Sequence, residues 1–279
     1  MLVYLNGHFI NEQKATVSVN NRSFRYGDGC FETIKLMHGK VLQPQYHTGR
    51  LFASLAQLYF DCPSYFTPTY IIQRIEELAA KNQHQTLARI RVTVFRGDSG
   101  LYDPSNMRPN LLIQSWPLNE ENNQLNSNGL VLDIYRDGHK ACDTLANIKS
   151  NNYLLYAMAA IAAKAQHCND MLVLNQHGRV ADSSIANLWL VEGDTLVTPA
   201  LTEGPVSGTV RRYLLEKLAS KGFSTIESTI TEERLMAADE VFLTNAIYGL
   251  KWVQRIGNQS YGSKWAAKIH AQLLQPLWQ

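Results

Sequence analysis

The sequence lacks the features that mark membrane, nucleic-acid-binding and metal-binding proteins. No apolar run approaches the roughly 20 residues that cross a bilayer, and the first ten residues have neither a basic segment nor a small-residue cleavage site. Lys and Arg (26) barely outnumber Asp and Glu (24) and are scattered along the chain. The eight histidines show no metal-ligand spacing. We therefore expect no membrane, nucleic-acid or metal partner.

The cysteines also lack a pattern. The four of them, Cys30, Cys62, Cys142 and Cys168, are widely separated and form no CxxC pair. Such cysteines are typical of reduced thiols in a cytosolic protein. With 45% hydrophobic and 18% charged residues, the composition is that of a globular protein. We therefore expect a cytoplasmic, globular protein without disulfides.

One composition shift divides the chain. Residues 117–128 are strongly polar and rich in Asn, which is typical of a linker. We expect an N-terminal α+β domain over residues 1–118, a linker over 119–128 and a C-terminal domain over 129–279. Any active site is then expected in the cleft between the two domains.

Hydrophobic periodicity predicts the elements of each domain. Before the linker it predicts a hairpin at 31–42, helices at 47–60 and 67–82, and strands at 87–96 and 110–116. After the linker it predicts strands at 130–135, 171–174, 185–191 and 240–244, alternating with helices near 152–165, 208–221 and 263–274. The fold class is therefore predicted to be α+β.

Lys149 ends an irregular segment directly before the long apolar helix predicted at 152–165. A lysine in such a place is expected to be desolvated, which lowers its amine pKa from the usual ~10.4. A neutral amine can attack a carbonyl, which is how lysines hold pyridoxal phosphate as a Schiff base. Alone, the segment fits a snorkelling lysine at a helix start equally well.

Two further features suit an anionic cofactor. Residues 203–211 form a glycine-bracketed segment that leads into an amphipathic helix, and free amides at a helix start bind anions. The alternative is an ordinary loop with Ser207 as the N-cap. Arg50, in the first predicted helix, is a candidate second anion partner, although a single arginine of this kind is more often a surface residue.

Asp182 is the candidate acid for a pyridine nitrogen. It lies between two strand-like runs, and a carboxylate paired with the ring nitrogen would keep that nitrogen protonated. The alternative is a turn aspartate that accepts hydrogen bonds from its own backbone.

Six segments in this order resemble the fold-type IV, class IV aminotransferase-like pyridoxal phosphate enzymes. They are residues 26–33, 47–51, 149–153, 178–188, 208–211 and 238–246. That family includes branched-chain aminotransferases, D-amino acid aminotransferases and 4-amino-4-deoxychorismate lyases. The resemblance implies a two-domain, D-amino acid aminotransferase-like architecture, pyridoxal 5′-phosphate as cofactor, and a homodimer.

The resemblance also implies roles for single residues. Lys149 would hold the cofactor and transfer protons. The other implied cofactor contacts are Arg50, Tyr153, Asp182, Gly208, Thr209, Val210, Thr244, Asn245 and Ala246. This chain departs from the family at three of these positions: relatives usually carry Glu at Asp182, Thr at Val210 and a hydroxyl at Ala246.

Within the family, the local sequence resembles the lyase branch. Residues 244–247 read Thr-Asn-Ala-Ile, where branched-chain aminotransferases typically read Thr-Gly-Thr-Ala, and residues 26–33 resemble the lyase form. The Arg-x-His carboxylate trap of D-amino acid aminotransferases is absent from residues 98–102. The second arginine frequent in lyases is also missing there.

The implied reaction is elimination of pyruvate from 4-amino-4-deoxychorismate, giving 4-aminobenzoate for folate biosynthesis. Thr33 would assist proton transfer. The candidate substrate-binding residues are Arg25, Tyr26, Arg96, Tyr102 and Lys251. One alternative is a class IV aminotransferase acting on branched-chain or D-amino acids. A second alternative, supported by the departures at Asp182 and Ala246, is a non-catalytic protein that binds pyridoxal phosphate or another metabolite.

Overall fold

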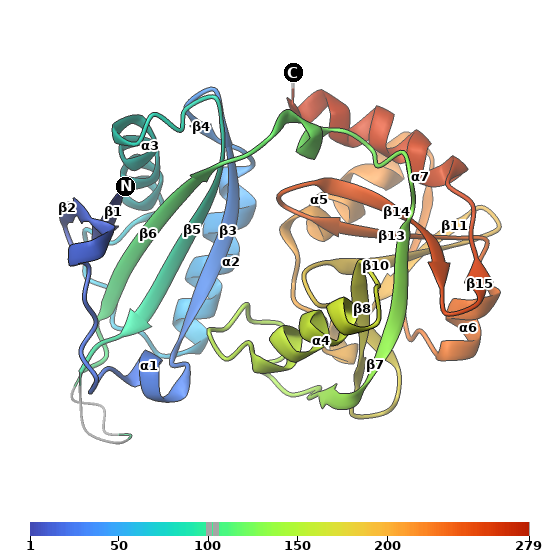
Figure 1. The fold of residues 1–279 in the computed structure, drawn as a ribbon, viewed down its shortest axis with the longest axis horizontal. Helices are drawn as coiled ribbons and strands as arrows, with labels where there is room; N and C mark the ends of the chain where they lie inside the picture. Colours follow the sequence, from blue (N-terminus) through green and yellow to red (C-terminus); the bar gives the residue numbers. More distant parts are fainter. Residues whose placement is uncertain (99–101, 103–105, 279) are drawn as a thin grey trace. The chain divides into compact units, whose positions relative to one another are not determined.

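The structure is a computed structural model that describes residues 1–98, 102 and 106–278 (Figure 1). The chain forms two compact units. The first comprises Met1–Asn122 with Ile148–Tyr153, and the second comprises Asn123–Asn147 with Leu154–Gln279. The sequence-based boundaries followed chain order and assigned Lys149 to the C-terminal domain, whereas its segment belongs to the first unit. No helix in the described part of the chain is long and apolar enough to span a bilayer.

The first unit contains a six-stranded antiparallel sheet in the order β2-β1-β6-β5-β3-β4. Its strands are β1 (Leu2–Leu5), β2 (His8–Asn11), β3 (Gly29–Met37), β4 (Lys40–Val41), β5 (Leu87–Arg96) and β6 (Pro109–Pro117). The predicted hairpin of β3 and β4 is confirmed. The long central strands β3 and β5 carry the side chains of the candidate site.

The helices of the first unit are α1 (Arg22–Tyr26), α2 (Pro44–Gln57) and α3 (Pro68–Lys81), with a 3₁₀ turn at Glu12–Lys14. Both α2 and α3 begin with proline, whose fixed φ suits a first helical position, and Thr67 caps α3 by accepting from the Tyr70 amide. Their apolar faces cover one face of the sheet. This core includes Ile34, Leu36, Ile90, Val92, Leu51, Leu55, Ile71, Ile75 and Leu78.

The second unit contains a nine-stranded mixed sheet in the order β12-β11-β10-β13-β14-β7-β8-β9, with β15 beside β14. The strands are β7 (Leu130–Lys140), β8 (Asp170–Asn175), β9 (Val180–Ser183), β10 (Asn187–Glu192), β11 (Thr195–Pro199), β12 (Ser224–Ser228), β13 (Glu240–Asn245), β14 (Gly249–Ile256) and β15 (Gln259–Ser260). The pairs β7/β8, β7/β14 and β11/β12 are parallel. Separate apolar cores lie on the two sides of this sheet.

The helices of the second unit are α4 (Leu154–Ala165), α5 (Thr209–Leu218), α6 (Glu232–Ala237) and α7 (Lys264–Ile269), which continues as a π-helical turn (His270–Leu274). Short 3₁₀ turns lie at Glu120–Asn123, Leu201–Glu203, Ala219–Lys221 and Gln275–Trp278. Helices α5 and α7 pack on the core that contains Trp189 and Phe242. Helix α5 therefore starts against the sheet, where its first turn becomes part of the candidate site.

Two sequence-based expectations are corrected. The strand predicted at 185–191 begins only at Asn187, because the Ser183 hydroxyl accepts from the Ala186 amide and closes a tight turn before it. Asp182 lies in strand β9, which the sequence did not predict, so it is not a turn aspartate. The turn places the start of β10 next to Asp182, where it supplies one of the aspartate's partners.

Candidate active site

In the first unit, the segment that carries Lys149 pairs with the start of β3. The amide of Phe31 donates to the carbonyl of Lys149 at 2.9 Å, and the amide of Asn151 donates to the carbonyl of Gly29 at 2.9 Å. A Cβ at Gly29 would lie 2.3 Å from the carbonyl oxygen of Val94 in β5 and 2.6 Å from Nδ2 of Asn151, so the close approach of both neighbours requires glycine. The backbone from Lys149 to Asn151 is thereby fixed to the sheet.

The side chain of Lys149 is half-buried between two aromatic rings. Its Nζ lies 4.6 Å from the centre of the Phe31 ring and 5.0 Å from that of Tyr153, and it donates to the Tyr153 hydroxyl at 3.2 Å. These contacts hold the amine in one place and remove part of its hydration, as expected for a lysine that reacts with a carbonyl.

The same aromatic ring holds a second cation. The Arg91 guanidinium lies 3.8 Å from the centre of the Phe31 ring, and Arg91 pairs across the strands with Thr33. Since side chains two residues apart in a strand share a face, Phe31 and Thr33 lie on the same side of β3. Burial lowers the pKa of Arg91. Lys149, Phe31, Thr33 and Arg91 thus form one group on the sheet face opposite the helical core.

Arg50 is held by a buried carboxylate. Its Nε and Nη2 donate to the two oxygens of Glu32 at 2.7 and 2.5 Å, and Nδ1 of His47 lies 2.8 Å from Glu32 Oε2. Burial alone would raise the pKa of Glu32, but Arg50 and His47 outweigh burial and lower the pKa to about 2. The bidentate pair fixes the guanidinium, while Tyr153 is close enough to affect the pKa of Arg50.

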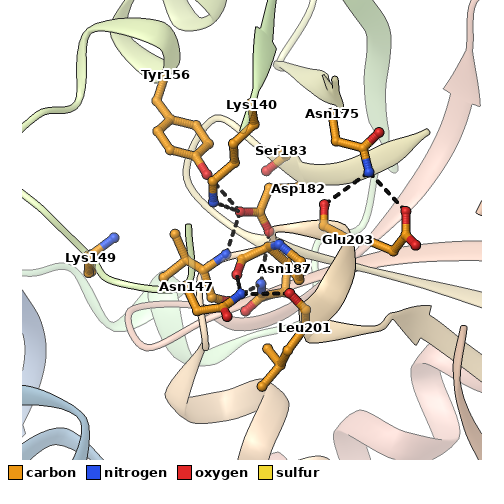
Figure 2. Close-up of polar contacts among 12 residues, drawn as sticks. Lys140, Asn147, Lys149, Tyr156, Asn175, Asp182, Ser183, Asn187, Leu201 and Glu203 are labelled. Atoms are coloured by element: carbon orange, nitrogen blue, oxygen red, sulfur yellow. Dashed lines mark hydrogen bonds and ion pairs between the residues drawn. The ribbon is translucent and has the colours of Figure 1, made fainter. Parts of the chain in front are cut away.

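In the second unit, Asp182 is only 2% exposed and is surrounded by hydrogen-bond donors (Figure 2). Its Oδ2 accepts from the Tyr156 hydroxyl and the Val206 amide, each at 2.8 Å, and lies 3.4 Å from Nζ of Lys140. Its Oδ1 accepts from Nδ2 of Asn187 at 2.9 Å. These hydrogen bonds fix the buried carboxylate in position, and it can accept a further hydrogen bond from a group such as a protonated ring nitrogen.

The first turn of α5 has the features of an anion-binding site. Its N-cap, Gly208, has no side chain to bond the first-turn amides, and Thr209 and Val210 follow it at positions that are 4% and 5% exposed. Ser207, the alternative N-cap, lies one residue earlier and is not the cap. Free amides and the helix dipole at such a start favour a phosphate group.

The loop before α5 is anchored at both ends (Figure 2). Nδ2 of Asn147 donates to the carbonyls of Leu201 and Pro205 at 2.9 and 2.6 Å. The buried Glu203 accepts from Nδ2 of Asn175 at 2.9 Å and from Nε of Arg179 at 2.5 Å. These bonds fix the direction in which the chain enters α5.

Four other expected site residues lie in β13, the following turn and β14. Thr244 is 1% exposed, and its hydroxyl accepts from Nε1 of Trp189 at 3.2 Å. The Asn245 side chain accepts from the amides of Ile247 and Tyr248 and so closes the turn that contains Ala246. Lys251 lies over the Tyr248 ring at 5.2 Å.

The remaining expected substrate residues have other partners in the described chain. Arg96 is 6% exposed, donates to Asp28 at 2.6 Å and to the Leu58 carbonyl, and stacks on Phe60. Arg25 donates to Asn20 and the Val19 carbonyl. Tyr26 and Tyr102 lie with ring centres 5.4 Å apart. Residues 99–101, within the stretch searched for an Arg-x-His trap, lie outside the described residues.

Several residues of the site were missed by the sequence analysis. In the first unit they are Phe31, Glu32, His47 and Arg91, and in the second they are Lys140, Tyr156 and Asn187. Strand alternation could have found Arg91, because Ile90, Val92 and Val94 are fully apolar and place residues 89, 91 and 93 on the opposite face.

Comparison with known proteins gives the family. The sequence model described as "Amino-transferase class IV" matches residues 29–256. The chain belongs to the class IV aminotransferase family. An aminodeoxychorismate lyase from Vibrio harveyi is 30% identical over 86% of this chain and 87% of that protein. A D-alanine aminotransferase from Listeria monocytogenes (strain 10403S) is 24% identical over 99% of this chain and 94% of that protein.

A solved structure supports the fold class. The branched-chain amino acid aminotransferase of T.th., solved with pyridoxamine 5′-phosphate, aligns with a TM-score of 0.88 at 22% identity, over 99% of this chain and 93% of that chain. The family resemblance of the six segments and the expected fold-type IV architecture are therefore confirmed. The relatives of this chain include both lyases and aminotransferases, so the reaction must be argued from the site.

Proposed function

We propose that this chain is a pyridoxal phosphate-dependent 4-amino-4-deoxychorismate lyase. The observation that carries the proposal is that the Schiff-base lysine and a second cation share one ring: Lys149 and Arg91 both lie on Phe31. A cation beside the reacting amine suits a substrate that carries carboxylates. The substrate of the lyase carries two carboxylates.

The cofactor is pyridoxal 5′-phosphate, and the residues present fit it. Lys149 supplies the amine for its aldehyde, and Asp182 supplies the buried carboxylate for its ring nitrogen. The uncapped first turn of α5 supplies amides for its phosphate, with Arg50 as the second anion partner. At Gly208 a Cβ would lie 1.7 Å from Asn187 Oδ1, so this part of the cradle accepts only glycine.

The protein's own residues account for the proton transfers. The cofactor, when bound, supplies an electron sink for the negative charge that develops at the substrate carbon. Lys149, the amine that would hold the cofactor, would take the proton from C4 of the carbocycle. The C–O bond to the enolpyruvyl group then breaks, the ring becomes aromatic, and the released enolpyruvate takes up a proton at its methylene carbon to give pyruvate. Thr33, on the same face as Phe31, would relay that proton.

Substrate binding is assigned to the face of β3 and β5. Arg91 is half-buried and would form a charge-assisted pair with one substrate carboxylate. Arg96, the sequence-based candidate, already donates to Asp28 and to the Leu58 carbonyl. We therefore give Arg91 the role first considered for Arg96, and we keep Arg25, Tyr26, Tyr102 and Lys251 as candidates for the second carboxylate.

A coupled assay tests the reaction. The purified holoenzyme is given 4-amino-4-deoxychorismate, pyruvate is followed with lactate dehydrogenase, and 4-aminobenzoate is followed by its fluorescence. Equal amounts of both products, abolished by Lys149→Ala, are expected. Conversion of the cofactor to its amine form by an amino acid, without 4-aminobenzoate from the lyase substrate, would instead identify an aminotransferase. A protein that binds the cofactor and does neither would be a non-catalytic binding protein.

The assembly proposed is a homodimer. On α4, Leu154, Met158 and Ile161 are 69%, 42% and 60% exposed and recur at helical spacing, so they form one apolar stripe. An exposed apolar stripe of this kind is typical of a protein–protein interface. The four cysteines are free thiols, which supports the proposal of a cytoplasmic enzyme that supplies 4-aminobenzoate for folate biosynthesis.

A further inference from the structure

The pyridine-side carboxylate of this chain has a cationic neighbour of its own. Lys140 ends strand β7, directly after the pairing of β7 with β8 shifts between Tyr135 and His139. Its Nζ lies 3.4 Å from Asp182 Oδ2 and 5.2 Å from the centre of the Tyr156 ring, and its side chain is 11% exposed (Figure 2). The ion pair is therefore nearly dry, where charges act strongly on one another.

The donors around Asp182 divide unevenly between its two oxygens. Oδ2 faces three donors, from Lys140, Tyr156 and the Val206 amide, whereas Oδ1 accepts one hydrogen bond, from Asn187. A carboxylate oxygen has two lone pairs, so Oδ2 is saturated and Oδ1 retains the capacity for one more donor. The ring N–H of the cofactor would take that place.

We propose that Lys140 is a positioning residue of the cofactor site, which holds the Asp182 side chain in place and limits how strongly that carboxylate retains a proton on the ring nitrogen. A cation beside the aspartate offsets its negative charge at the ring and so lowers the affinity of the ring nitrogen for a proton. With Lys140 present, the ring is therefore a weaker electron sink than it would be if Asp182 had no cation beside it.

The charged surroundings of Lys140 support a role tied to Asp182. Burial lowers the pKa of Lys140, and Asp182 opposes this effect more than any other group does. Cys142 and Asp143, in the loop after β7, also favour the charged amine, and Tyr156 of α4 faces it. Among the described residues, Asp182 is the carboxylate to which Lys140 donates a hydrogen bond.

The test reads the ring nitrogen directly. Holoenzyme is prepared with pyridoxal phosphate isotope-labelled at the ring nitrogen, and the NMR shift of that nitrogen is followed against pH without substrate. In Lys140→Met the pH midpoint of ring protonation is expected to rise by on the order of one pH unit or more, because an opposing charge has been removed. Lys140→Arg, which keeps the charge, should stay near the wild-type midpoint. Tyr156→Phe, which removes a neutral donor from the same oxygen, should shift it less than Lys140→Met.

Several outcomes would overturn the proposal. One is an unchanged midpoint in Lys140→Met, and another is a ring nitrogen that stays fully protonated in both proteins at every pH where they remain folded. If Lys140→Met does not bind the cofactor, Lys140→Gln takes its place. Loss of binding in both, with normal binding by Lys140→Arg, would make Lys140 part of the scaffold and not a modulator of the ring. Because no substrate is present, the result is independent of whether the enzyme is a lyase or an aminotransferase.

Discussion

Gly208, at the start of α5, lies so close to Asn187 that it has no room for a side chain: a Cβ on Gly208 would lie 1.7 Å from Oδ1 of Asn187. Asn187 uses its Nδ2 to donate to Asp182 at 2.9 Å and to the Val206 carbonyl at 2.8 Å. The anion cradle and the pyridine acid are therefore coupled through one asparagine side chain. Displacing that side chain disturbs both ends of the cofactor site.

Gly208→Ala should consequently weaken cofactor binding at least tenfold and lower the free energy of unfolding of the apoprotein by about 1–3 kcal/mol, since overpacking forces Asn187 to move. The measurements are titration of the apoprotein with pyridoxal phosphate and urea unfolding. Gly49→Ala is the matched control: Gly49 is exposed in α2, and a Cβ there meets no atom within 4 Å. Gly49→Ala should bind the cofactor normally, and its free energy of unfolding should rise by roughly 0.5–1 kcal/mol. Normal binding by Gly208→Ala would contradict the coupling.

The Glu32 carboxylate should make stability depend on acid pH. Its pKa falls from the ordinary 4.5 to about 2 in the folded protein, so its contribution is present above the unfolded pKa and is lost as pH falls toward 2. The shift corresponds to about 3 kcal/mol. Glu32→Gln should remove about this much at neutral pH and flatten the fall in stability between about pH 5 and pH 2, measured by urea unfolding of the apoprotein across that range.

Glu76→Gln provides the comparison for this prediction. Glu76 pairs with the exposed Lys40 at 2.9 Å, and an exposed pair of this kind contributes at most about 1 kcal/mol. A pH profile for Glu32→Gln that matches those of the wild type and of Glu76→Gln would rule out Glu32 as the group responsible.

Local patterns were sufficient to predict much of the fold. The strand predicted at 87–96 is β5 (Leu87–Arg96), and the helix predicted at 67–82 is α3 (Pro68–Lys81), because each has a strong period and clear ends. The strands β9, β11 and β12 were missed, since each has only four or five residues, too few to show a clear period.

Site residues could be predicted where they lie in a recognisable local segment. They could not be predicted where they meet only through contacts between distant parts of the chain. Lys149 and Asp182 were proposed as site residues from their segments, and their roles stay predictions. Lys140 and Tyr156 lie 42 and 26 residues from Asp182, and no local pattern in one sequence records that they meet. Arg96 was a candidate for a substrate carboxylate and Arg91 was not considered, although five residues along a strand place the two on opposite faces.

The apolar stripe on α4 should control assembly. Ile161→Glu adds a charge to this stripe and should shift the protein from dimer to monomer at micromolar concentration, as measured by sedimentation or light scattering. Ile226→Glu is the same substitution at a position that is 48% exposed on β12, away from the stripe, and should leave the assembly unchanged. A dimer that survives Ile161→Glu would place the interface elsewhere, and a wild-type monomer would contradict the proposed homodimer.

Arg91 should determine how the acidic substrate is held. Removing its charge in Arg91→Met should lower kcat/KM for pyruvate release by on the order of 100-fold, mainly through KM, because one charge-assisted pair with a carboxylate is lost. Arg89→Met tests whether the effect is specific. Arg89 lies two residues away on the same face of β5, but it is exposed and stacks on Trp116 at 4.7 Å, so its loss should change kcat/KM only about threefold or less. Since neither substitution touches Lys149, both variants should bind pyridoxal phosphate with the wild-type absorbance. Equal losses in the two variants would mean that the whole face attracts the anion, and the assignment of one carboxylate to Arg91 would fail.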